Sequence, residues 1–170
     1  DLVAGLPNET WRSFRDGFDQ LLAIGPSEIQ LGILKRLRGA PITLIAEAHG
    51  LVFSPHHPYE VLQTQEMNFT EIQRLKRIAR YFELYHNSGD FPRSMAMLWE
   101  SNSSSFEAFA GLSNYIWKKT GRTHELALRR LAELLYSFLV EHGQPVTDVA
   151  NALRADYHRL PGRRDKLAFE

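Results

Sequence analysis

The chain has 170 residues, of which 44% are hydrophobic and 24% charged, and this is typical of a globular protein with one or two domains. Twenty basic and twenty acidic side chains give a formal net charge of +0, which argues against a protein that binds the phosphate backbone of nucleic acid. The absence of cysteine excludes disulfides, thiolate nucleophiles and cysteine-bound metals or clusters, and the lack of an apolar run of about 20 residues argues against a segment that spans a membrane.

The N-terminal part of the chain predicts a strand, a helix and a second strand. A short apolar run at residues 1–5 is typical of a buried strand that ends at Gly5. A helix from about residue 10 to 24 follows, since its apolar side chains recur at helical spacing, and Gly25 ends it. Residues 28–34 alternate between apolar and other side chains, which predicts the second strand. The order forms one βαβ unit, so we expect parallel strands with the helix on one face.

The rest of the chain is predicted to be mostly helical. A short helix is expected at residues 41–48 and a short strand at 59–64, within a stretch that carries proline and histidine. Two later helices begin with capping signals, at Asn68-x-x-Glu71 and Ser104-x-x-Glu107. Apolar spacing predicts helices at 69–82, 92–100, 104–116, 123–142 and 146–157, of which 123–142 is expected to be the longest.

The change from βαβ to helices predicts four segments along the chain. These are the βα elements at 1–50, a connector at 51–66, a helical domain at 67–162 and a frayed tail at 163–170. The predicted fold class is therefore α+β, mostly α, with a βαβ remnant of a larger sheet followed by a helical bundle.

The polar side chains form no recognisable catalytic or metal-binding pattern. His56 and His57 are adjacent and point in different directions in an extended chain, and the other histidines are scattered, so we predict no metal site. No Ser-His-Asp set or carboxylate pair can be assembled, so we predict no catalytic residue. The basic stretch at residues 74–80 favours a solvated helix face over a nucleic-acid surface, because acidic residues lie beside it.

The most informative stretch is Asp1-Leu2-Val3-Ala4-Gly5-Leu6-Pro7-Asn8-Glu9-Thr10. It resembles the fifth strand of radical SAM cores and the turn after it. Residues 32–42 look like the sixth strand with its Gly-Thr-Pro-Leu turn. Residues 54–62 and 85–91 are similar to the linker and the C-terminal helical domain of cobalamin-binding-type radical SAM proteins. The resemblance spans nearly the whole chain, although Asn8 replaces the usual Gly and Ala40 the usual Thr.

The resemblance implies a βαβ remnant of a radical SAM partial barrel followed by a helical bundle of unassigned function. It places Val3 and Gly5 on the strand that runs beside the adenine of S-adenosylmethionine, which makes them the candidate cofactor-binding residues. The parent enzyme would hold a [4Fe-4S] cluster, S-adenosylmethionine and a cobalamin. The CxxxCxxC loop for the cluster belongs to an earlier part of the barrel, so we expect this chain to hold no cofactor and to be inactive alone.

Two roles for the helical domain follow from the resemblance. It would cover or shape the substrate site of the barrel, its partner in the same chain, or it would be a non-enzymatic interaction module attached to the barrel. A lid predicts a polar-lined groove, whereas an interaction module predicts a contiguous exposed apolar patch. The chain begins at Asp1 without a methionine or a leader, so we expect a piece of a longer, cytoplasmic protein with an unidentified substrate.

Overall fold

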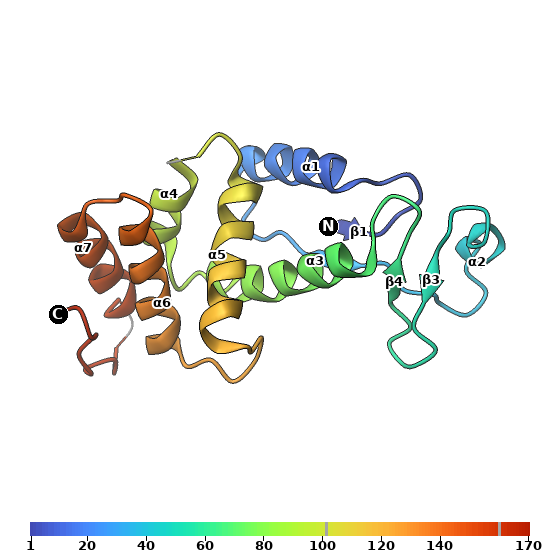
Figure 1. The fold of residues 1–170 in the computed structure, drawn as a ribbon. Coiled ribbons are helices and arrows are strands. Elements are labelled where there is room, and N and C mark those ends of the chain that lie inside the picture. Colours follow the sequence, from blue (N-terminus) through green and yellow to red (C-terminus); the bar gives the residue numbers. More distant parts are fainter. Residues whose placement is uncertain (101, 160) are drawn as a thin grey trace. The chain divides into compact units, whose positions relative to one another are not determined.

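A computed structural model describes residues 1–100, 102–159 and 161–170 of the chain. Figure 1 shows its elements, which are mainly helices. The strands of the described residues form two separate two-stranded sheets, so the predicted α+β, mostly α fold class is confirmed. The chain divides into two compact units, Asp1–Ala79 and Arg80–Glu170. The domain limits expected from the sequence stay a prediction.

The first unit begins with the predicted βαβ arrangement. Strand β1 (Leu2–Ala4) pairs in parallel with β2 (Leu31–Ile33), and helix α1 (Trp11–Ile24) connects them. The prediction of parallel strands is therefore confirmed. Strand β1 is shorter than the predicted run because the backbone turns at Gly5, whose φ of 90° lies in the left-handed region.

Helix α1 begins and ends where its sequence predicts. The Thr10 hydroxyl accepts a hydrogen bond from the Ser13 N–H at 3.1 Å, and the Ser13 hydroxyl accepts one from the Thr10 N–H at 2.9 Å. This reciprocal cap satisfies two of the N–H groups that a helix start leaves unpaired. Gly25 ends the helix in the left-handed conformation, with φ of 73°. Phe14 and Phe18 lie on the apolar face of the helix and are buried in the core.

A small antiparallel sheet follows in the region predicted as a connector. Helix α2 (Ile42–Ile45) is shorter than the predicted 41–48. Strand β4 (Val61–Gln63) lies within the predicted strand, and it pairs with β3 (Val52–Phe53), which the sequence did not predict. A two-residue strand is too short to show an alternating pattern, so only its partner could reveal it.

Helix α3 (Phe69–Phe82) begins with the predicted capping box. The Asn68 N–H donates to Glu71 Oε2 at 2.9 Å, and the Glu71 N–H donates to Asn68 Oδ1 at 3.0 Å. Ile72 and Leu75 of its apolar face are buried, whereas Phe69 is 52% exposed. A π-helical turn, η1 (Glu83–Asn87), continues the helix.

The second unit is built from helices that pack around an aromatic core. They are α4 (Pro92–Glu100), α5 (Ser105–Thr120), α6 (Leu128–Glu141) and α7 (Val146–Tyr157). Figure 1 shows α6 beside α7, and α4 also packs on α7. Tyr85, Phe91, Phe106 and Phe109 are fully buried in this unit. No helix within the described part of the chain is long and apolar enough to cross a membrane.

The prediction of a helix at 123–142 was wrong about where the helix begins and about its being the longest. Helix α6 begins at Leu128 and has 14 residues, whereas α5 has 16. Glu125 adopts a φ of 57° and Ala127 is extended, and neither conformation continues a right-handed helix. The apolar residues directly before Leu128 therefore lie outside the helix.

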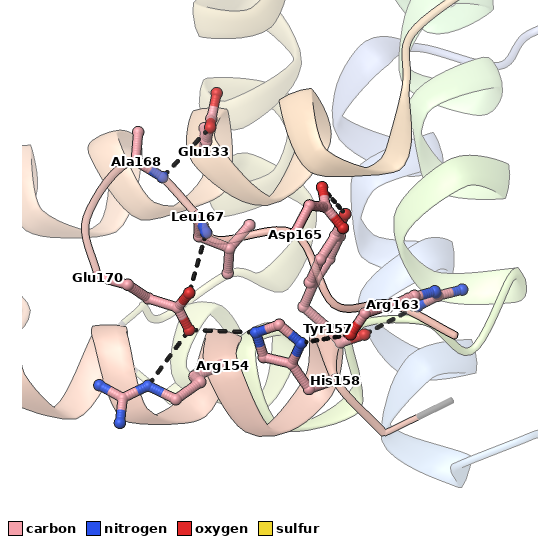
Figure 2. Close-up of polar contacts among 9 residues, drawn as sticks. All are labelled: Glu133, Arg154, Tyr157, His158, Arg163, Asp165, Leu167, Ala168 and Glu170. Carbon is pink, nitrogen blue, oxygen red and sulfur yellow. Dashed lines mark hydrogen bonds and ion pairs between the residues drawn. The ribbon is translucent and has the colours of Figure 1, made fainter. Parts of the chain in front are cut away.

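The C-terminal segment is docked, so the prediction of a frayed tail was wrong. Leu167 is only 3% exposed, and Phe169 stacks on Tyr136 with ring centroids 4.0 Å apart. The Tyr157 hydroxyl donates to Asp165 Oδ2 at 2.8 Å, and Arg163 Nη2 lies 3.1 Å from Asp90 Oδ1. Figure 2 shows how the segment folds back over α7.

His158 holds this segment through both of its ring nitrogens (Figure 2). Its Nδ1 lies 2.8 Å from the Arg163 carbonyl oxygen, and its Nε2 lies 3.2 Å from Glu170 Oε1. Both partners accept hydrogen bonds, so both nitrogens donate only when the ring is protonated. The bond to the Arg163 carbonyl, and then Glu170, raises the pKa of His158 above its ordinary value. A bond from the Leu167 N–H, followed by His158, lowers the pKa of Glu170.

We predict that docking of the C-terminal segment weakens as the pH rises. The folded pKa of His158 lies above its unfolded value of about 6.5, so the contribution of the protonated ring is fully present below that value and is lost as the pH rises through the folded pKa. The loss should be partial, because Arg154 Nε also lies 3.4 Å from Glu170 Oε1. The weakening of docking can be measured by hydrogen exchange at the amides of Leu167 and Ala168. The rates are compared at about pH 5.5 and 8.5 after correction for the intrinsic exchange rates.

The matched variant is His158→Gln, which cannot gain a proton in this range. It should remove most of the difference in protection between the two pH values. Equal protection of these amides in the parent chain at both pH values would contradict the prediction.

Candidate functional site

Val3, which the resemblance places on the cofactor side, is the central residue of β1. The Leu2 N–H donates to the Gln30 carbonyl at 2.8 Å, and the Leu34 N–H donates to the Ala4 carbonyl at 2.9 Å. Backbone groups of successive strand residues face opposite neighbours, so those of Val3 point away from β2. Among the described strands, β1 pairs with β2 alone, and none pairs with its other edge.

Gly5, the second candidate cofactor residue, makes the turn at the carboxyl end of β1. It is buried, and a Cβ atom added to it would lie 2.5 Å from Val61 Cγ1. Its N–H donates to Glu9 Oε2 at 2.9 Å. Burial raises the pKa of the Glu9 carboxyl, and bonds from the Gly5 and Leu6 N–H groups partly offset that rise. The turn and its packing thus already require glycine here, and the role of Val3 and Gly5 at a cofactor stays a prediction.

A hollow of about 780 Å³ opens beyond the carboxyl end of β2. It is lined by Lys35, Arg36, Leu37, Arg38, Gly39, Thr43, His57, Pro58 and Tyr59, and we call it the cationic pocket. Its place agrees with the general position of ligand sites in parallel sheets, which lie outside the carboxyl ends of the strands. Val3 and Gly5 are not among its lining residues.

Backbone pairing holds the two walls of the cationic pocket together. The Arg36 N–H donates to the Tyr59 carbonyl at 2.9 Å, and the Val61 N–H donates to the Leu34 carbonyl at 2.8 Å. The chain after β2 is thereby tied to the start of β4. The sequence alone does not reveal this site, because its two walls lie far apart along the chain. The cluster of basic residues after the second strand was its one visible sign.

The cationic pocket is positive because Lys35, Arg36 and Arg38 line it and no carboxylate does. The acid that lies next to it in sequence, Glu60, forms an ion pair with the Lys76 ammonium group. The guanidinium of Arg36 lies over the Phe53 ring, 5.9 Å from its centroid. The pocket can therefore attract an anion without a competing carboxylate on its own walls.

The chain matches one known protein family over most of its length. Residues 47–167 match the family described as "Protein of unknown function (DUF4080)". The chain belongs to the DUF4080 family. A search of curated proteins finds no match to it. The DUF4080 match begins before β3 and includes the docked segment as far as Leu167.

The DUF4080 region supplies one wall of the cationic pocket. His57, Pro58 and Tyr59 lie inside the match, whereas the basic residues 35–38 come before it. The pocket is thus built jointly by the DUF4080 region and the βαβ unit.

A smaller pocket of about 250 Å³ lies within the helical part of the DUF4080 region. Its lining is mixed, with Asn102, Glu107, His142 and Gln144 beside apolar residues. His142 Nδ1 lies 2.8 Å from the Phe138 carbonyl oxygen, and its ring stacks on that of Phe138. Within the described residues, no group of three His, Cys, Asp or Glu side chains is placed to hold a metal ion.

Proposed function

We propose that this chain is the C-terminal part of a radical SAM enzyme. Its βαβ unit would be the end of the partial barrel, and the DUF4080 region would be the helical domain that follows. The resemblance of residues 1–10 and 32–42 to two successive barrel strands supports this proposal. The parallel pairing of β1 with β2 supports it as well, because a partial barrel requires that order.

The observation that carries the proposal is that β1 has a partner strand on one edge only among the described strands. A two-stranded parallel sheet is not a stable unit by itself, and the backbone groups of Val3 point to an edge with no described partner strand. Ile24 and Leu44 of the same unit are apolar and 79% and 89% exposed. Both features favour a larger sheet, whose other strands we expect from the upstream part of the same protein.

The chain does not fit an iron–sulfur cluster, because it has no cysteine to bind iron. The cluster, S-adenosylmethionine and cobalamin would therefore be held mainly by the upstream part, and this chain alone should catalyse nothing. The DUF4080 region would cover or shape the substrate site. The identity of the substrate is left open.

The alternative, a helical module for protein interaction, has less support. Such a module needs a contiguous exposed apolar patch. In the described residues of the predicted helical domain, 67–162, the large apolar side chains at least 40% exposed are Phe69 on α3, Trp117 on α5 and Val146 on α7. Each of these helices carries one such side chain, which does not make a patch.

The test is to express the longer protein encoded from upstream of Asp1 and to reconstitute it with iron and sulfide. We expect a CxxxCxxC loop, the visible absorbance of a [4Fe-4S] cluster, and 5′-deoxyadenosine when S-adenosylmethionine and a reductant are added. Replacing the three cysteines by alanine should remove both signals. An upstream region without this loop, or 5′-deoxyadenosine formed by the 170-residue chain alone, would overturn the proposal.

A further inference from the structure

The cationic pocket concentrates positive charge that the surrounding chain does not balance. Lys35, Arg36 and Arg38 lie within four consecutive residues, and no acidic residue occurs from Gln30 to Ala46. All three side chains are exposed at the wall of the pocket. Glu60 is held by Lys76, so it is not available to neutralise them. Cations gathered in a concave site raise the local concentration of anions.

The chemistry of these groups favours phosphate. Two guanidinium groups and an ammonium group match the several oxygens of a phosphate dianion, to which arginine donates two parallel hydrogen bonds. The Thr43 hydroxyl and the His57 ring add further hydrogen-bonding groups to the lining.

The size of the pocket and its apolar lining residues indicate a ligand larger than an inorganic ion. Its volume of about 780 Å³ lies within the usual range for small-molecule sites. Leu37 and Tyr59 of the lining are 65% and 40% exposed, so they offer apolar surface beside the charges. S-adenosylmethionine suits the pocket poorly, because its sulfonium and ammonium groups outnumber its one carboxylate and leave it with a net positive charge, like the pocket itself.

We propose that the cationic pocket binds an organic phosphate, with the phosphate on Lys35, Arg36 and Arg38 and the organic body against Leu37 and Tyr59. This inference goes beyond the proposed function and does not depend on it, because all of these residues belong to this chain. The site joins the βαβ unit to the DUF4080 region, so a bound phosphate would contact both.

The test is calorimetric titration of the full 170-residue chain with pyrophosphate, ADP and adenosine at low salt. We expect ADP to bind at least tenfold more tightly than adenosine, and pyrophosphate to compete with it. The variant Lys35→Gln/Arg36→Gln/Arg38→Gln should weaken ADP binding by about 30-fold or more, since charge-assisted bonds are lost. Lys118→Gln removes an exposed charge from α5 and should leave ADP binding unchanged.

Three results would overturn the proposal. They are no ADP binding by the parent chain at millimolar concentration, adenosine binding as tight as that of ADP, and unchanged affinity in the triple variant. Tighter binding of a single-stranded RNA oligonucleotide than of ADP would also overturn it, in favour of a nucleic-acid surface. Arg36→Lys/Arg38→Lys keeps the charge but loses the paired hydrogen bonds of arginine, so it should bind ADP more tightly than the triple glutamine variant and less tightly than the parent chain. None of these outcomes bears on whether an upstream radical SAM barrel exists.

Discussion

Replacing Gly5 by alanine should lower the free energy of unfolding by about 3 kcal/mol, since two separate costs add. The φ of 90° at this residue is unfavourable for any side chain with a Cβ. The added Cβ would also lie 2.5 Å from Val61 Cγ1, closer than real Cβ contacts allow. Val61 is 1% exposed and its branched side chain is stiff, so it cannot move aside cheaply. Urea unfolding followed by circular dichroism measures the change.

Gly25→Ala is the matched control for the backbone part of this cost. Gly25 has a similar φ of 73°, and nothing lies within 4 Å of a Cβ added there. Gly25→Ala should lower the free energy of unfolding by only about 1 kcal/mol. The double variant Gly5→Ala/Val61→Ala should show a favourable coupling, because the smaller side chain removes the clash. Equal effects of Gly5→Ala and Gly25→Ala would mean that the close contact with Val61 contributes nothing.

Replacing Asp156 by alanine should destabilise the second unit by about 3–4 kcal/mol, because buried donors would lose their partner. Asp156 lies on α7 and is 1% exposed. Its Oδ2 accepts hydrogen bonds from the N–H of Ser94 at 2.9 Å and from the Ser94 hydroxyl at 2.7 Å, and its Oδ1 accepts one from the Arg93 N–H at 3.3 Å. Helix α4 begins at Pro92, so these N–H groups have no partner inside the helix. The carboxylate of one helix thus caps the next.

Two further variants separate the cap from a general effect of charge. Asp156→Asn keeps one acceptor oxygen and should cost about half as much as Asp156→Ala. Asp148→Ala removes an exposed carboxylate from the first turn of α7, where only the helix dipole is affected, and should cost less than about 1 kcal/mol. Thermal unfolding followed by circular dichroism measures all three. A loss for Asp156→Ala no larger than that for Asp148→Ala would show that the buried cap is not important for stability.

The local elements of this protein could be predicted because their signals lie close together in the sequence. The predicted caps at Asn68 and Ser104 each bind a group three residues away, and the structure contains both. The helix predicted at residues 92–100 is present with these bounds as α4. The βαβ order predicted the parallel pairing of β1 with β2, since a helix between two strands favours that direction.

Other features depend on residues that are distant in the sequence. The segment at 163–170 was predicted to be a frayed tail, but Asp90 and Tyr157 bind it from other elements. Strand β3 forms because β4 lies beside it, and the cationic pocket exists because Tyr59 pairs with Arg36. No local sequence pattern predicts contacts between such distant residues.

The sequence by itself therefore determined the positions of most helices, the parallel βαβ order and the α+β, mostly α class of this protein. Its signals are hydrogen bonds and apolar repeats within one or two turns of chain. Only the tertiary structure decided which polar groups meet. Asp156 capping α4 and the two walls of the cationic pocket both join segments far apart in the chain. A hydrogen bond between distant segments forms only when the packing of the core has brought them together, and that packing depends on all of the apolar faces at once.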